Sequence, residues 1–220
     1  MKRFARIVSC VSFALLVAAS RGYGQTPAQP PADASRYYAA GEVGATFGHK
    51  SSGSFGAELG GRLTRTVGVF LEGGRMLNAG TQALDDRAAR IATNANATSS
   101  ATYKINYFDA GIRLAPQMYW PVDPYLVIGF GLAAVRAKTD FAVGGTTVPP
   151  ESIGIRSGDD LNGTVKKPFF TLGGGATYTF ARRCFADFSL RYGRVSANNV
   201  IENDKGINTL RAQVGAGIRF

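Results

Sequence analysis

LRAQVGAGIRF, residues 210–220, is the stretch that decides the fold class of this chain. Its side chains alternate in character, with Leu210, Ala212, Val214, Ala216, Ile218 and Phe220 on one face and Thr209, Arg211, Gln213 and Arg219 on the other. Successive residues of a β-strand point to opposite faces, so this pattern predicts a strand between an apolar and a polar medium. A soluble sandwich could present the same pattern, and the choice depends on the other segments.

The same alternation recurs along the chain. It predicts strands at residues 36–48, 53–63, 66–76, 102–115, 124–138, 168–180, 185–195 and 207–220. Their connections alternate between tight turns and long loops: 64–66, 116–123 and 182–184 are short, 77–101 and 139–167 are long, and 196–206 is intermediate. Short turns at one end, long loops at the other and an even strand number are typical of outer-membrane barrels. We therefore predict an all-β fold, an eight-stranded antiparallel transmembrane β-barrel with up-and-down meander topology.

The first residues have the pattern of an export signal. A basic start, Met1–Arg6, precedes an apolar run from Ile7 to Ala19 and then small residues. That run is shorter than the roughly 20 apolar residues that span a bilayer as a helix. We predict a signal peptide at 1–25, a disordered periplasmic lead-in rich in proline at 26–35, and a barrel domain at 36–220.

The charge balance restricts the partners. The chain has 25 Lys and Arg, 15 Asp and Glu, and a net charge of +10 at pH 7, which falls to +6 without residues 1–25. The bases are scattered rather than clustered on one element, so a nucleic-acid partner is not expected. For an exported protein, we expect contact with outer-membrane lipid and lipopolysaccharide phosphates instead.

The two faces of the predicted strands differ in charge. The expected lipid-facing set includes Tyr37, Val43, Phe55, Leu59, Val69, Leu71, Phe108, Ile112, Leu126, Phe130, Leu172, Tyr178, Phe188 and Leu190. The alternate set carries the charges that we predict as a lumen network: Glu42, Glu58, Arg62, Glu72, Asp109, Arg113, Arg191 and Arg211. Buried ions must pair, and an eight-stranded barrel has room for packed side chains or one small ligand. An open aqueous channel is therefore not expected.

Aromatic residues lie near the predicted strand ends, where outer-membrane barrels place two girdles at the lipid interfaces. We expect one girdle at the turn end and one at the loop end. The turn end would hold Tyr37, Tyr38, Tyr119, Trp120, Tyr125, Phe180 and Phe220, and the loop end Phe47, Tyr103, Phe141 and Phe169.

With its leader, its alternation, its loop asymmetry, the segment Pro124–Leu132 and the aromatic Phe220, the chain resembles the small outer-membrane barrels of the OmpA, OmpX and OmpW type over about residues 36–220. The resemblance implies a bacterial outer-membrane protein with tight turns and both termini in the periplasm and long loops outside. It also implies that the β-barrel assembly machinery reads the last strand, through Leu210, Val214, Ile218 and Phe220. No peptidoglycan-binding domain follows the barrel, so wall anchoring of the OmpA kind is not expected.

Catalytic groups are scarce. The single histidine, His49, lies two residues from Ser51, a spacing found in the lipid A deacylase barrels, and on a strand the two would share a face. We favour coincidence in a polar hairpin, because those enzymes carry their pair late in the chain. One histidine and one mature cysteine, Cys184, form no zinc set, and the loop acids match no calcium loop. We expect no enzyme activity, no cofactor and no metal.

Two loop features could contribute to surface contacts. Residues 82–92 are good helix formers with Leu84, Ala88 and Ile91 spaced for one face, and could cap the lumen or remain disordered. Four bases, Arg136, Lys138, Lys166 and Lys167, flank a long loop and could bind lipopolysaccharide phosphates or simply be solvated.

The sequence favours a structural or surface-interaction protein, expected as a monomer, that acts through its extracellular loops. Two alternatives stay open. One is a narrow channel for small apolar solutes, as in OmpW, with a gap left by small inward residues at 44, 129, 131, 133, 173 and 175. The other is a lipid A-modifying enzyme at His49 and Ser51.

Overall fold

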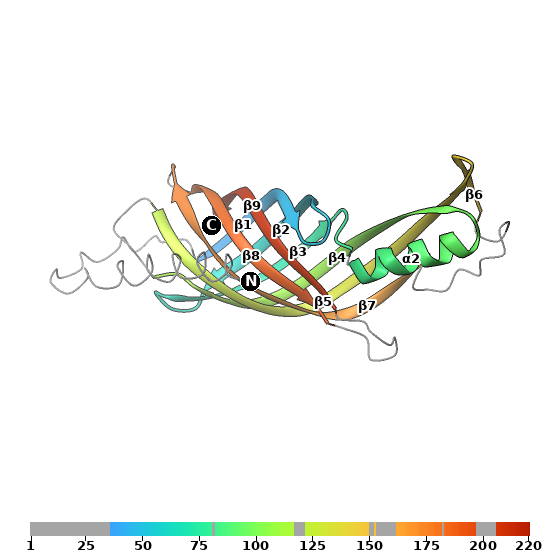
Figure 1. Ribbon diagram of the computed structural model, residues 1–220. Coiled ribbons are helices and arrows are strands. Elements are labelled where there is room, and N and C mark those ends of the chain that lie inside the picture. The colour runs from blue at the N-terminus through green and yellow to red at the C-terminus, as the bar shows by residue number, and fades with distance from the viewer. Residues whose placement is uncertain are drawn as a thin grey trace, which may run out of the picture. The chain divides into compact units, whose positions relative to one another are not determined.

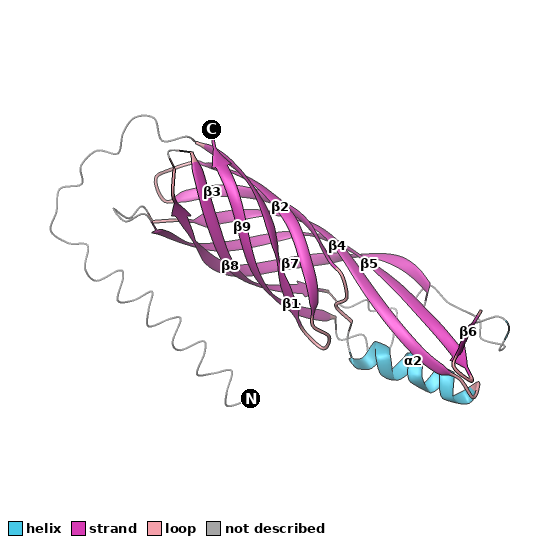
Figure 2. Ribbon diagram, turned by 90° about the horizontal axis from the view of Figure 1, so that it is seen from above, coloured by secondary structure: helices cyan, strands magenta, loops and turns pink. Residues whose placement is uncertain are grey.

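The protein is an antiparallel β-barrel with a projecting extension (Figures 1 and 2). The computed structural model describes residues 36–80, 82–116, 122–149, 152, 162–181, 183–196 and 206–220. The predicted signal peptide and lead-in lie outside these residues. The elements are β1 (Tyr37–Phe47), β2 (Ser52–Arg62), β3 (Val67–Met76), α2 (Gln82–Asn94), β4 (Thr98–Leu114), β5 (Val122–Val143), β6 (Thr146–Val148), β7 (Asn162–Thr179), β8 (Cys184–Val195) and β9 (Ile207–Arg219).

Eight of these strands form a closed meander. Each pairs antiparallel with the next along the chain, with β5 followed by β7, and the pairing of β1 with β9 closes the cylinder. The predicted eight-stranded up-and-down barrel is confirmed. Following paired residues once around the barrel leads from Tyr37 to Phe47, ten residues further along the same strand. Such a stagger requires strands tilted by about 40° to the barrel axis.

The outer surface of the barrel is apolar. Many large hydrophobic side chains on alternate strand positions are exposed, including Val43, Phe55, Leu59, Leu71, Phe108, Ile112, Leu126, Phe130, Leu172, Phe188, Leu190, Val214 and Ile218. Phe130 has 65% of its surface exposed. Soluble proteins do not leave a continuous apolar surface of this extent in water. The outer wall therefore fits hydrocarbon, and the soluble sandwich is ruled out.

The two ends of the barrel differ. At the end that we call the turn end, short connections join β2 to β3 and β7 to β8, and the first and last barrel strands begin and end there. At the opposite end, β4, β5 and β7 continue past the other strands as 17-, 22- and 18-residue strands (Figure 2). We call the projecting part, residues 98–104, 136–143, 146–148 and 162–167, the ribbon.

The ribbon corrects three predicted boundaries. Strands were expected to begin at 102, end at 138 and begin at 168, whereas they begin at 98, end at 143 and begin at 162. The outward positions of the ribbon are polar, as at Lys104, Arg136 and Asp140. The outward-facing apolar residues, which marked the predicted strands, therefore end before the strands do. The predicted loops 77–101 and 139–167 are consequently shorter than expected.

Helix α2 covers the inner face of the ribbon. Ala88 packs with Ala101, Tyr103 and Ala137, and Ala92 packs with Phe141. Among the described residues, no opposite barrel wall covers this inner face, and the apolar side of the helix packs against it instead. The sequence left a helix and disorder open for residues 82–92, and the structure has a helix that continues to Asn94. The Leu84 side chain lies outside the described residues. No described helix is long and apolar enough to cross a membrane.

Aromatic rings fill the inside of the barrel. Tyr37, Phe47, Phe180 and Phe220 are exposed as expected of girdle residues. In contrast, Tyr38, Tyr103, Tyr125, Phe141 and Phe169 face inward, which corrects their assignment to the girdles. Tyr119 and Trp120 lie outside the described residues.

Several inward rings lie over inward glycines of another strand. A Cβ on Gly175 would stand 2.6 Å from the Tyr125 hydroxyl, and one on Gly129 would stand 2.9 Å from the Phe70 ring. The small residues thus make room for rings, a pairing that compensates for the weakness of glycine in strands.

We predict that Gly131→Ala destabilises the barrel, because a Cβ there would overlap the backbone carbonyl of Phe108 in the paired strand. The expected loss is about 1–3 kcal/mol of unfolding free energy, typical of overpacking. It can be measured as the urea midpoint at which an unboiled sample loses its fast-migrating folded band. Gly41→Ala is the matched control, since no atom lies within 4 Å of its added methyl. Equal midpoints for the two variants would contradict this account.

Candidate functional site

The centre of the lumen is held by a buried arginine on β8. The Arg191 guanidinium lies 2.6 Å from Glu72, 2.6 Å from Glu58 and 3.1 Å from Glu42, measured between nitrogen and carboxylate oxygen. Arg191 and these three acids are almost fully buried. One side chain therefore joins β8 to β1, β2 and β3 across the lumen.

A second arginine shares one of these acids. Arg211 on β9 lies 2.7 Å from Glu72 and donates to the Tyr107 hydroxyl. Arg211 is also directly opposite Arg191 in the β8–β9 pairing, where like charges repel. Glu72 offsets this repulsion, because one of its oxygens contacts each arginine.

The acids form a matching wall. Glu58 pairs with Glu72 across β2 and β3, and Glu72 pairs with Asp109 across β3 and β4. Such a row of carboxylates is unfavourable by itself. It is tolerated because β8 and β9 place two guanidiniums on the facing wall, which offset part of the negative charge.

The network continues toward the turn end through Arg113. Its guanidinium lies 2.9 Å from Glu58 and 3.6 Å from Asp187, and it stacks 3.5 Å from the centre of the Tyr125 ring. Asp187 was missed by the sequence analysis. Its position would have revealed it, because it shares the inward parity of Arg191 on the same strand.

Six of the eight predicted lumen charges, Glu42, Glu58, Glu72, Arg113, Arg191 and Arg211, are joined in this network. The other two lie apart from it. Asp109 is buried beside Thr171 and makes no ion pair with any described residue. Arg62 lies at the turn end, in a pocket with Arg36 and Arg65.

An apolar cluster closes the lumen on the ribbon side of the charges. It consists of Met76, Ala79, Ile105, Tyr107, Ala133, Val135, Phe169, Val195 and Ile207. Two of the small inward positions at which the channel alternative could leave a gap are tightly packed: Ala133 is fully buried in this cluster, and a Cβ on Gly173 would meet Arg191 at 2.8 Å. A solute crossing the barrel would have to displace both the apolar cluster and the ion pairs.

His49 contacts an acid of α2. Its Nε2 lies 3.1 Å from Asp85 in the first turn of α2, and Lys50 lies 2.8 Å from the same carboxylate. The Lys50 ammonium also donates to the Ala101 carbonyl. The β1–β2 hairpin is thereby tied to the helix and the ribbon. Within the described residues, no group of three His, Cys, Asp or Glu is arranged to hold a metal.

Basic side chains gather on the outer face of the ribbon. Lys104 on β4 is directly paired with Arg136 on β5, and Lys166 on β7 lies opposite Ala134 on β5. All three are exposed, and none pairs with an acid among the described residues. Lys138, in contrast, lies 3.1 Å from Asp140. We call Lys104, Arg136 and Lys166 the basic patch.

The model of the outer membrane protein beta-barrel domain family matches residues 11–220. The chain belongs to this family. A search of the curated proteins found no significant match. Among solved structures, neisserial surface protein A (NspA) is similar, with a TM-score of 0.54, 14% identity, and coverage of 84% of this chain and 96% of that one. The similarity establishes the shared fold.

Two further barrels are similar at lower scores. The N-terminal barrel domain of Pseudomonas aeruginosa OprF has a TM-score of 0.47 and 15% identity, covering 84% of this chain and 98% of that one. The outer membrane enzyme PagL has a TM-score of 0.45 and 14% identity, covering 83% and 99%. At these scores, neither similarity assigns an activity to this chain.

Membership in the family makes this a protein of the bacterial outer membrane. Its apolar outer wall therefore faces lipid, and the ion pairs of its lumen lie at the depth of the bilayer. Charges there are tolerated only if they face the interior and pair. The network thus satisfies the condition under which charged strands can be inserted.

We predict that Arg191→Gln strongly destabilises the barrel, because three carboxylates then face one another with one guanidinium fewer. Breaking a buried ion pair on one side costs about 3–5 kcal/mol. Urea unfolding in detergent micelles, followed by tryptophan fluorescence or gel migration, measures the loss. Arg194→Gln, an exposed site on the same strand, should change stability by less than about 0.5 kcal/mol. Comparable losses at both sites would refute the central role of Arg191.

Proposed function

We propose that this protein is a sealed barrel that holds the ribbon and α2 at the cell surface as an interaction surface. Two features together carry the proposal. Ion pairs and an apolar cluster fill the lumen, and this filling argues against transport as the main role. The strands continue beyond the apolar wall as the ribbon, which supplies a rigid platform of the kind that positions binding residues.

The proposed orientation has the turn end and both barrel termini in the periplasm and the ribbon outside. Outer-membrane barrels have short periplasmic turns and longer extracellular segments. The short connections from β2 to β3 and from β7 to β8, compared with the 22-residue β5 at the other end, support this arrangement.

The ligand that the ribbon fits best is lipopolysaccharide. The basic patch lies just past the last apolar outward residues of β4 and β5, Phe108, Leu132 and Ala134. Lipid A carries phosphates at this level of the outer leaflet, and clustered Lys and Arg bind phosphate through charge-assisted hydrogen bonds. Three neighbouring cations without a described acidic partner support this assignment over simple solvation.

Two contacts to Asp85, from His49 and from Lys50, tie the β1–β2 hairpin to α2. A serine nucleophile needs its histidine as the base, and among the described residues no hydrogen bond joins Ser51 to His49. We therefore propose that the barrel acts without enzymatic activity.

The last strand is proposed as the signal for the β-barrel assembly machinery. Val214, Ile218 and Phe220 are exposed on the outer wall, with Leu210 on the same face. Phe220 lies beside Tyr37, with ring centres 6.3 Å apart, at the seam where β1 and β9 close the barrel. Because closure leaves no free strand edge in the apolar wall, we propose that the protein is a monomer.

The purified protein should give no discrete current steps in a planar bilayer, because no continuous water path crosses the ion pairs and the apolar cluster. A sixteen-stranded porin in the same bilayer is the positive control, since its wide barrel leaves an aqueous channel. Reproducible single-channel steps would support the narrow-channel alternative and overturn the sealed barrel.

Replacing the basic patch by glutamine, in the variant Lys104→Gln, Arg136→Gln, Lys166→Gln, should weaken binding of lipopolysaccharide in detergent about tenfold or more. Each charge-assisted hydrogen bond to phosphate contributes about 1.5–3 kcal/mol, and about 1.4 kcal/mol corresponds to tenfold. The affinity can be measured by native mass spectrometry, with dephosphorylated lipopolysaccharide as a ligand control. The control variant Arg183→Gln removes an exposed charge at the turn end and should bind like the parent protein. Unchanged affinity in the patch variant would contradict the proposal.

A further inference from the structure

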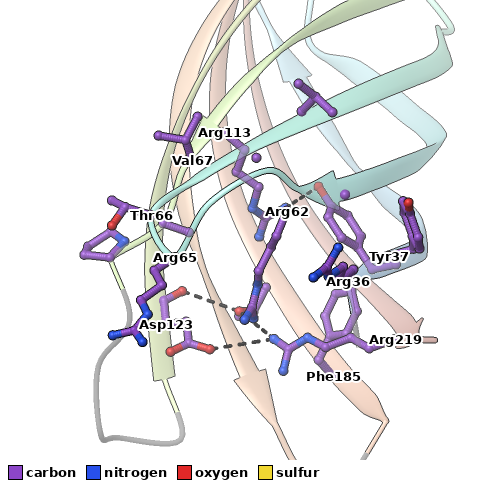
Figure 3. A pocket seen from close by; sticks show the side chains of 17 residues that line it. Arg36, Tyr37, Arg62, Arg65, Thr66, Val67, Arg113, Asp123, Phe185 and Arg219 are labelled. Carbon is purple, nitrogen blue, oxygen red and sulfur yellow. Dashed lines mark hydrogen bonds and ion pairs between the residues drawn. The ribbon is translucent and has the colours of Figure 1, made fainter. Parts of the chain in front are cut away.

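The turn end of the barrel gathers arginines around one acid. Arg36, Arg62, Arg65 and Arg219 line a single pocket together with Asp123. Figure 3 shows the side chains of Arg62, Arg65 and Arg219 lying around that of Asp123. We call these four arginines the arginine mouth.

The charge of the mouth is poorly balanced. Arg219 lies 3.7 Å from Asp123, a long contact, and donates to the Thr179 hydroxyl at 2.8 Å. Among the described residues, no acid pairs with Arg36, Arg62 or Arg65. Like charges held this close repel one another, and an anion bound between them would relieve the repulsion. The planar guanidinium matches phosphate in a two-point geometry, which makes phosphate the favoured anion.

The same pocket has an apolar side. Its lining also includes Tyr37, Val67 and Val69, which occupy outward positions of β1 and β3. Leu63, in the adjoining turn, has 67% of its surface exposed. A ligand that fills the whole pocket therefore has a phosphate at one end and hydrocarbon at the other. A water-soluble phosphate ester would use the arginines alone.

We propose that the arginine mouth binds the phosphate of an anionic phospholipid, whose acyl chains lie on the outer wall along Val67 and Val69. The lipid comes from the leaflet at the turn end. The inference rests on the proposed function only in naming that leaflet the periplasmic one. The site is separate from the basic patch, because the two lie at opposite ends of the barrel.

The direct test is native mass spectrometry of the full barrel in non-ionic detergent, titrated with phosphatidylglycerol. The expected result is binding that weakens as ionic strength rises, since exposed charges are screened by salt. The mouth variant Arg36→Gln, Arg62→Gln, Arg65→Gln should bind about tenfold or more weakly. The patch variant Lys104→Gln, Arg136→Gln, Lys166→Gln should bind like the parent. Equal affinity in the parent and mouth variants would overturn the site.

Two further ligands separate the possible sources of phosphate. Phosphatidylcholine, with the same chains and no net charge, should bind about tenfold more weakly than phosphatidylglycerol, and so should glycerol 3-phosphate, which has no chains. Equal binding of phosphatidylcholine would overturn recognition of charge, and equal binding of glycerol 3-phosphate would overturn the lipid as ligand.

A milder variant covers the case in which the triple variant does not fold. Arg65→Gln alone changes an exposed turn residue, and should lower the affinity for phosphatidylglycerol several-fold without changing the urea midpoint. Unchanged affinity here, with a folded barrel, would also overturn the proposal. None of these results bears on conductance or on lipopolysaccharide binding, so the proposed function stands or fails separately.

Discussion

The structure depends on closure of the sheet by the pairing of β1 with β9. In hydrocarbon there is no water to satisfy an unpaired backbone N–H or C=O group, so a membrane-spanning sheet must have no edge. The ten-residue stagger accumulated around the barrel makes the ends of β1 and β9 meet in register, from Tyr38 with Arg219 to Phe47 with Leu210. Once the cylinder is closed, alternate side chains have only two surroundings, the lipid outside and a narrow interior.

The narrow interior explains the arrangement of charges. Carboxylates on β1 to β4 face guanidiniums on β8 and β9, and Glu72 lies between the two arginines that would otherwise repel each other. The remaining space is taken by aromatic rings that lie over glycines, as Tyr125 does over Gly175. Both features support the sealed lumen that we propose, because the ion pairs and the rings fill the interior among the described residues.

The function that we propose therefore lies at the two ends of the barrel. At one end, the strands outlast the apolar wall and form the ribbon, which α2 covers on its inner side and the basic patch marks on its outer side. At the other end, the arginine mouth joins a cationic rim to the apolar wall. Both ends thus offer cations where phosphates of the two leaflets would lie, with the apolar wall between them.

The sequence by itself determined the strand number, the meander and the outward face, because a period of two in a segment such as 210–220 is a local property. It also indicated which charges face inward, since Glu72 and Arg191 lie opposite the apolar set in their own strands. Tertiary structure alone decided which ions pair, because Arg191 and Glu72 are 119 residues apart and the stagger brings them level. It likewise decided the length of the ribbon, because there the strands pack against α2 on their inner face and no longer carry apolar residues on their outer face. It also decided that Tyr125 and Phe169 face inward, which their position near a strand end could not reveal.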